Sequence, residues 1–184
     1  TFTFIDLFAG IGGFRVAGQH VQGSCVFTSE WDKYARRAYF MNFGQVPFGD
    51  ITQFTKSTEA LNRIPAHDVL CGGFPCQDIS YAGRGAGLEG ERSGLFFEAI
   101  RVVRLIRPRY VLLENVAALL TRGLDRVLGT LASVGYDAEW HCIPASAVGA
   151  PHQRDRVWIV AYPSVVFGDG RQFHASRHRQ SQSR

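Results

Sequence analysis

The sequence predicts an α/β fold with a mostly parallel, doubly wound sheet. Short apolar runs of strand length alternate with longer segments that have helical periodicity. No run approaches the roughly 20 apolar residues that a bilayer demands, and 46% of the 184 residues are hydrophobic. We therefore expect a cytoplasmic protein without a membrane partner, with one folded domain in residues 1–163 and a basic, disordered tail in residues 164–184.

The expected elements follow one another in regular order. Strands are expected at residues 2–7, 25–29, 68–71, 110–114, 138–143 and 157–162, with a weaker candidate at 46–48. Helices are expected at residues 12–20, 31–42, 94–106 and 123–134. In the third helix an apolar stripe contains Leu95, Ile100, Val103 and Ile106. Between residues 72 and 93 the periodicity stops in a Gly-, Ser- and Arg-rich stretch, which predicts a functional loop.

Charge and cysteine usage narrow the function only slightly. Most of the net charge of +4 comes from residues after Pro163, so the body is nearly neutral. Arginine outnumbers lysine 18 to 2, which suits bidentate phosphate contacts but also fits the codon bias of a GC-rich genome. The four cysteines lack the spacing of a zinc site, so no metal is expected.

A glycine-rich turn follows the first expected strand. It reads DLFAGIGG from Asp6 to Gly13, and such a turn lets a ligand approach backbone N–H groups closely. Arg15 stands where a dinucleotide fingerprint requires glycine, which argues against a pyrophosphate site. Taken alone, the turn fits a cofactor loop and a plain strand-to-helix connection equally well.

Acidic residues follow the next two expected strands. Glu30 lies about 20 residues past the first glycine, where a nucleotide fold places an acid for ribose hydroxyls, and Trp31 follows it. An indole there can stack on adenine, although a helix-terminal acid and a core aromatic would have the same spacing. Asp50 can accept a hydrogen bond from an adenine amino group or cap the next helix.

Reactive side chains are expected at the same edge of the sheet. Cys76 lies in a polar, glycine-flanked loop just after Pro75, a poor position for a core residue. Glu114 ends the next strand, and Arg154 and Arg156 precede the last one. An arginine would favour a thiolate, and a neighbouring carboxyl group could hold a proton for donation. Taken one by one, these charged residues fit a solvated surface equally well.

Together and in this order, the segments resemble the DNA cytosine-5 methyltransferase family over roughly residues 2–163. The similar motifs are DLFAGIGGFR (6–15), Glu30-Trp31, Gly49-Asp50-Ile51, GFPCQDIS (73–80), Glu114-Asn115-Val116 and QRDRV (153–157). The resemblance implies a Rossmann-like S-adenosylmethionine-dependent methyltransferase fold. It also implies methyl transfer from S-adenosylmethionine to C5 of a flipped cytosine in double-stranded DNA, as in restriction-modification systems of bacteria or phage acting at the nucleoid.

The resemblance also implies roles for individual residues. Cys76 would add to cytosine C6, Glu114 would bind N3 and the exocyclic amine, and Arg154 with Arg156 would orient the base. The donor-binding residues implied are Phe8, Ala9, Gly10, Ile11, Gly13, Glu30, Trp31, Asp50, Ile51, Pro75 and Leu95. The implied DNA contacts, in or beside a loop that closes over the base, are Gln77, Ser80 and Arg84.

Two departures from the family pattern keep alternatives open. His152 stands where the family usually has glutamine, and only 21 residues follow Pro163, too few for a target recognition domain and a final donor-site segment. We therefore expect a truncated enzyme or one part of a split enzyme whose partner polypeptide recognises DNA. The alternatives are an RNA cytosine-5 methyltransferase, a catalytically silent binding fragment and, disfavoured by Arg15, an NAD-dependent dehydrogenase.

Overall fold

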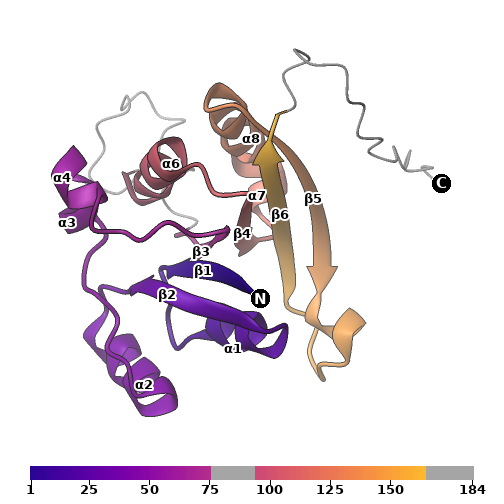
Figure 1. The fold of residues 1–184 in the computed structure, drawn as a ribbon. Coiled ribbons are helices and arrows are strands. Elements are labelled where there is room, and N and C mark those ends of the chain that lie inside the picture. The colour runs from indigo at the N-terminus through magenta and orange to yellow at the C-terminus, as the bar shows by residue number, and fades with distance from the viewer. Residues whose placement is uncertain (76–93, 165–184) are drawn as a thin grey trace.

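A six-stranded sheet forms the centre of the molecule in the computed structural model, which describes residues 1–75 and 94–164 (Figure 1). The strand order is β2-β1-β3-β4-β6-β5. The strands are β1 (Phe2–Leu7), β2 (Gly23–Ser29), β3 (Val69–Gly73), β4 (Tyr110–Val116), β5 (Tyr136–Pro144) and β6 (Asp155–Pro163). The helices are α1 (Gly13–His20), α2 (Lys33–Phe43), α3 (Thr52–Thr55), α4 (Thr58–Leu61), α6 (Gly94–Ile106), α7 (Leu119–Arg122), α8 (Leu124–Ser133) and the 3₁₀ helix η2 (Ala145–Val148).

The direction of the strands confirms the predicted, mostly parallel sheet. Strand β1 pairs in parallel with β2 and β3, and β3 pairs in parallel with β4. Strand β6 runs antiparallel to both of its neighbours, β4 and β5. The beginning of β6 therefore meets the end of β4 at one edge of the sheet.

Helices cover both faces of the sheet, as a doubly wound fold requires. In Figure 1, α6 and α8 lie on one face and α1 lies on the other. Alternate side chains of β1 point to opposite faces of the sheet. Ile5 and Leu7 belong to the main core, whereas Phe4 packs against Gly18 of α1 on the other face. No helix within the described residues is long and apolar enough to cross a bilayer.

Most expected elements form close to their predicted bounds, and one prediction is wrong. Residues 46–48 do not form a strand, because only a single parallel bridge joins Ser29 to Phe48. In α6, Ile100 and Val103 are buried as predicted, but Leu95 and Ile106 are only half-buried. The sequence reading missed three further buried residues of this helix, Phe96, Ala99 and Val102. The predicted tail after Ser164 lies outside the described residues.

The strand order contains a topological switch point. Strand β1 lies between β2 and β3, so the chain leaves β1 toward one side and later returns to its other side. Open α/β sheets bind ligands at such a switch point, beyond the carboxyl ends of the strands. Here those ends are Leu7, which leads into the glycine-rich turn, and Gly73, which leads toward Pro75.

Candidate active site

The turn after β1 has an unusual backbone that glycine makes possible. Phe8, Gly10 and Gly12 have φ angles of 58°, 54° and 99°, all in the left-handed region. A Cβ at Gly12 would lie 2.1 Å from the ring of Phe43, whereas a Cβ at Gly13 would have no neighbour within 4 Å. Phe8 adopts this region with a side chain, and such strain often marks a functional turn. The turn is therefore tightly folded on its inner side and open at Gly13, where a ligand can approach the backbone.

The carboxylate of Glu30 connects this turn to the end of β2. It is 8% exposed. Its Oε2 accepts from the backbone N–H of Gly10 at 2.8 Å, and its Oε1 accepts from the N–H of Asp32 at 2.8 Å. A carboxylate offers about four lone-pair sites, so acceptor capacity for ribose hydroxyls is left. The next residue, Trp31, is 75% exposed and free to meet a ligand ring.

Asp50 lies beside the same strand end, one residue before Ile51, which is the N-cap of α3. Its Oδ1 accepts from the N–H of Thr52 at 2.9 Å, in the first turn of α3. Ser29 donates from Oγ to the carbonyl oxygen of Gly49 at 2.7 Å, which ties Asp50 to β2. Among the described residues Oδ2 of Asp50 accepts no hydrogen bond, so it remains able to meet an amino group. The neighbouring Ile51 is 2% exposed.

A buried carboxyl group lies below the turn, and sequence reasoning did not assign it a role. Asp6 is fully buried, and neither of its oxygens has a hydrogen-bond partner among the described residues. Burial, together with the negative charge of Glu30, raises the pKa of Asp6 to about 8, although Arg15 opposes this shift. Asp6 is therefore largely protonated at neutral pH.

Two of the predicted site residues form an ion pair at the end of β4. The Nε of Arg156 lies 2.7 Å from Oε1 of Glu114, and the two side chains are 20% and 25% exposed. A Cβ at Gly73 would lie 3.0 Å from Oε2 of Glu114, so the absence of a side chain there leaves room for the carboxylate. The carboxylate and guanidinium thus meet directly beside the end of β3.

Asn115 fixes the start of the loop that carries the predicted nucleophile. Its side chain is 3% exposed, and its Nδ2 donates to the carbonyl oxygen of Phe74 at 2.9 Å. Pro75, which follows, is half-buried at the same edge. From the sequence, Asn115 was included in the motif Glu114-Asn115-Val116, but no role was predicted for it. An amide immediately after a strand-end acid could have indicated a residue that binds the neighbouring backbone.

The remaining predicted site residues divide into three groups. Arg154 is exposed and has a φ of 44°, and among the described residues Glu114 forms an ion pair with Arg156 rather than with Arg154. Ala9 is buried, Ile11 is 65% exposed, and Leu95 is half-buried at the start of α6. The positions outside the described residues are Cys76, Gln77, Ser80 and Arg84.

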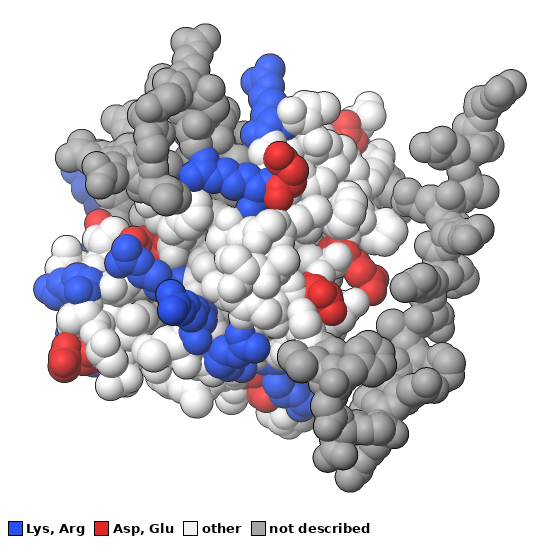
Figure 2. All heavy atoms as spheres, turned by 90° about the horizontal axis from the view of Figure 1, so that it is seen from above, with Lys and Arg blue, Asp and Glu red and all other residues white. Residues whose placement is uncertain are grey.

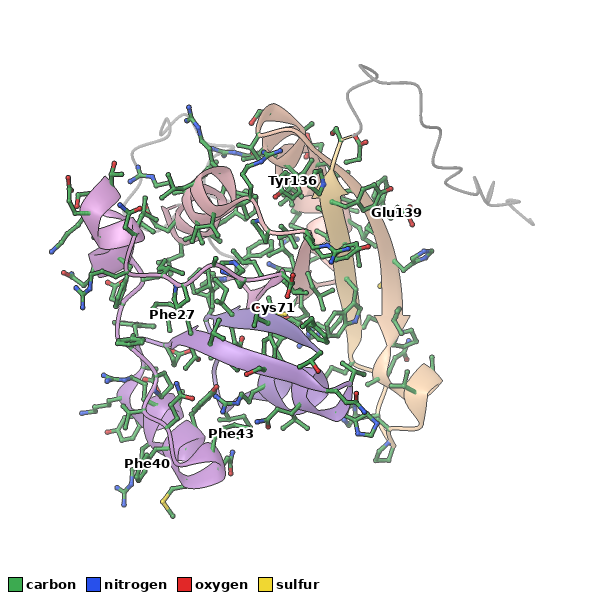
Figure 3. All side chains as sticks on the ribbon, in the orientation of Figure 1. Phe27, Phe40, Phe43, Cys71, Tyr136 and Glu139 are labelled. Atoms are coloured by element: carbon green, nitrogen blue, oxygen red, sulfur yellow. The ribbon has the colours of Figure 1, made fainter. Side chains whose placement is uncertain are left out.

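Cys71 is the other cysteine near this edge, and its environment makes it unsuitable as a nucleophile. It lies on β3 beside Asp6 and is 6% exposed (Figure 3). Burial, and secondarily the negative charge of Asp6, raises the pKa of its thiol above the usual range. A thiol that stays protonated in the interior is chemically inert.

Comparisons with known proteins identify the family. The model of the C-5 cytosine-specific DNA methylase family matches residues 2–178. The chain belongs to the C-5 cytosine-specific DNA methylases. Among type II methyltransferases, it is 44% identical to M.HpaII of Haemophilus parainfluenzae over 168 residues, which is 88% of this chain and 46% of that protein. It is 42% identical to M.HhaI of Haemophilus parahaemolyticus over 163 residues, 86% of this chain and 48% of that protein.

Solved structures support the methyltransferase fold of this family member. The S. pombe Dnmt2 methyltransferase has a TM-score of 0.74 at 20% identity, over 92% of this chain and 53% of that one. Spodoptera frugiperda DNMT2, as a triple mutant, has a TM-score of 0.72 at 20% identity, over 95% and 54%. The predicted Rossmann-like fold is thus confirmed. This methylase chain spans about half the length of the relatives that it matches.

Proposed function

We propose that this chain carries the catalytic centre of a DNA cytosine-5 methyltransferase that uses S-adenosylmethionine and forms a covalent adduct between Cys76 and cytosine C6. The observation that carries the proposal is the ion pair between Arg156 and Glu114, 2.7 Å apart beside Gly73. It puts a carboxylate and a guanidinium at the rim from which the Cys76 loop starts. That rim adjoins the glycine-rich turn at the switch point of the sheet.

The residues around the switch point fit the proposed donor. Glu30 would accept from the ribose hydroxyls, Asp50 from the adenine amine, and Trp31 with Ile51 would pack the ring. Phe8, Ala9, Gly10, Ile11 and Gly13 would line the turn, with Pro75 and Leu95 toward the methyl group. When bound, S-adenosylmethionine supplies an electrophilic methyl group on a positively charged sulfur.

The proposed chemistry starts at Cys76. Its thiolate forms a bond to C6 of cytosine, and the electron pair of the C5–C6 double bond makes C5 nucleophilic. The carboxyl group of Glu114 donates a proton to N3 as negative charge builds on the ring, and it accepts a hydrogen bond from the exocyclic amine. Arg156 holds Glu114 in place, Arg154 orients the base, and the N3 proton returns to Glu114 when the adduct breaks down. After C5 has gained the methyl group, a base removes the C5 proton, the sulfur–C6 bond breaks, and the thiolate is restored.

The proposed substrate is a cytosine flipped out of duplex DNA, because a stacked base cannot reach a nucleophile in a protein crevice. Gln77, Ser80 and Arg84 are proposed to contact the DNA strand around it. On the face shown in Figure 2, Lys and Arg side chains follow one another in a line, while acidic side chains form small groups. A line of cations suits a phosphate backbone, although it carries no sequence information. Action on DNA would place the protein at the bacterial nucleoid or on phage DNA.

Target recognition is proposed to come from polypeptide outside this chain's matched region. The relatives are about twice as long as the part that this chain matches. Either a longer form of the protein or a second polypeptide would then supply the DNA sequence preference. Co-expression with neighbouring coding sequence, followed by a DNA-binding assay, tests this part of the proposal.

The decisive experiment measures transfer of a labelled methyl group by the complete methyltransferase. Wild-type protein should label duplex DNA, Cys76→Ser should abolish labelling, and DNA containing 5-fluorocytosine should trap a covalent complex because C5 has no proton to lose. Transfer RNA serves as the comparison substrate. An unchanged rate for Cys76→Ser refutes the assignment of the nucleophile, and preferential labelling of transfer RNA favours the RNA-directed alternative.

A further inference from the structure

Phe48 belongs to a three-ring cluster although it is 45% exposed. Its ring stacks on Phe27 with centroids 4.9 Å apart and planes 15° apart. It also meets the edge of Phe54 at 5.2 Å, and Phe27 and Phe54 meet each other at 5.1 Å. The three rings come from β2, from the segment before Asp50 and from α3, so the cluster joins three parts of the chain.

The backbone of Phe48 is attached to the end of β2. Its N–H donates to the carbonyl oxygen of Thr28 at 2.9 Å, and its own carbonyl oxygen accepts from the N–H of Glu30 at 2.9 Å. Asp50 follows only two residues later. The peptide of Phe48 therefore links the backbone of Glu30 to the segment that carries Asp50, the two acids proposed to hold the ribose and the adenine.

We propose that Phe48 is a positioning residue that sets the spacing between Glu30 and Asp50 and thereby determines how well the site distinguishes adenine from other purines. This inference rests on the proposed donor site. The single bridge between Ser29 and Phe48 leaves the segment without further strand pairing. Three hydrogen bonds at Phe48 and Gly49 attach it to β2, and we infer that the side chain adds the remaining restraint that a full strand would give. Stacking on the buried Phe27 supplies it, because paired rings resist both sliding and rotation.

Phe40 provides a matched control within the same chain. It is 46% exposed, close to the 45% of Phe48. Phe40 extends from α2, whereas Phe27 comes from β2 (Figure 3). Replacing Phe40 by alanine removes the same side chain from a comparably exposed position without touching the three-ring cluster.

The test compares two ligands by calorimetric titration of the complete protein. S-adenosylhomocysteine carries the adenine amine, and S-inosylhomocysteine carries an oxygen in its place, which would face the Asp50 carboxylate unfavourably. Wild type should prefer the adenosyl ligand, and Phe48→Ala should reduce that preference about tenfold, since discrimination depends on an accurately placed polar group. Phe48→Tyr should restore the preference because it keeps the stacked ring, and Phe40→Ala should keep the wild-type value.

The possible outcomes distinguish a failure of the proposed donor site from a failure of the role proposed for Phe48. If wild type binds neither ligand, the proposed donor site is wrong and the role of Phe48 is refuted with it. If wild type discriminates and Phe48→Ala discriminates equally well, the donor site stands and the inference is wrong. Equal loss of both ligands in Phe48→Ala, with a lower melting temperature, would mean that the ring only supports the fold, which also overturns the inference.

Discussion

The Nε of Arg156 lies 2.7 Å from Oε1 of Glu114, joining the beginning of β6 to the end of β4. Both side chains remain partly exposed, so the pair faces the rim rather than the core. A guanidinium in this position fixes the orientation of the carboxylate and still leaves its second oxygen for a substrate. The pair therefore has the exposure and the free oxygen that the proposed catalytic role of Glu114 requires.

Glu114→Gln should reduce methyl transfer by the complete enzyme by about 100-fold or more, because an amide cannot give a proton to N3 and leaves the negative charge that develops on the base uncompensated. The binding of S-adenosylhomocysteine should change little, since Glu114 is proposed to contact the base and not the donor. Single-turnover rates and calorimetry measure the two effects separately. A variant that loses donor binding and rate in parallel would contradict this division of roles.

Gly12→Ala and Gly13→Ala should differ sharply although the residues are neighbours. Alanine at position 12 meets the Phe43 ring at 2.1 Å and requires a φ of 99°, so the free energy of unfolding should fall by roughly 2–4 kcal/mol. Alanine at position 13 has open space and should change stability by less than about 1 kcal/mol. Gly13→Ala should nevertheless weaken donor binding, because its methyl group occupies the approach to the backbone. Urea unfolding measures the stability of the two variants, and ligand titration measures their donor affinity. Unimpaired donor binding by Gly13→Ala would show that the donor does not approach the backbone at Gly13.

Asp6→Asn should stabilise the protein increasingly as the pH rises. In the folded protein the pKa of Asp6 is about 8, against an ordinary value of 3.8. Between these values the unfolded chain has lost a proton that the folded chain keeps, so ionisation favours unfolding by about 1.4 kcal/mol per pH unit at most. Asparagine cannot ionise. The difference in unfolding free energy between variant and wild type should therefore grow from pH 4 to pH 8 and level off above it, and a pH-independent difference would refute the assignment.

Asp32→Ala should lower the free energy of unfolding by about 1 kcal/mol. The Oδ1 of Asp32 accepts from the N–H groups of Tyr34 at 3.0 Å and Ala35 at 2.7 Å, at the start of α2. Asp32→Ser should recover most of the loss because serine also caps helices. Donor affinity should stay the same in both variants, because Glu30 accepts from the backbone N–H of Asp32 and not from its side chain. Thermal unfolding with parallel ligand titration provides the check.

The sequence alone predicted the bounds of a strand or helix where its apolar residues follow a regular period. The bounds of β1 and α6 were predicted to the residue. The error at residues 46–48 has a physical cause: Pro47 lacks an N–H for a strand ladder, and the apolar character of Phe48 serves ring stacking instead. The four-residue helices α3 and α4 escaped prediction because they are shorter than the helical period needs to be recognised.

The individual residues of the candidate site could be predicted, but the contacts between them could not. Strand-end positions indicated Glu30 and Glu114, since parallel strands bring their carboxyl ends to one edge. Asp50 was indicated by an expected strand at residues 46–48 that does not form. Sequence alone could not decide between Arg154 and Arg156 as the partner of Glu114, because that choice depends on the register between two strands far apart in the chain. The burial of Asp6 was also unpredictable, because a lone acid in an apolar strand can as well lie at its end in solvent.

The register between the antiparallel strands β6 and β4 determines where Arg156 lies relative to Glu114. Glu114 lies opposite Trp158 and Val116 opposite Arg156, so the guanidinium stands one diagonal step from the carboxylate on the same side of the sheet. Adding or removing a single residue at the start of β6 would turn the arginine toward the α6 layer. Because the buried residues Val157, Ile159 and Ala161 hold this register, the position of the arginine depends on them as much as on its own place in the sequence.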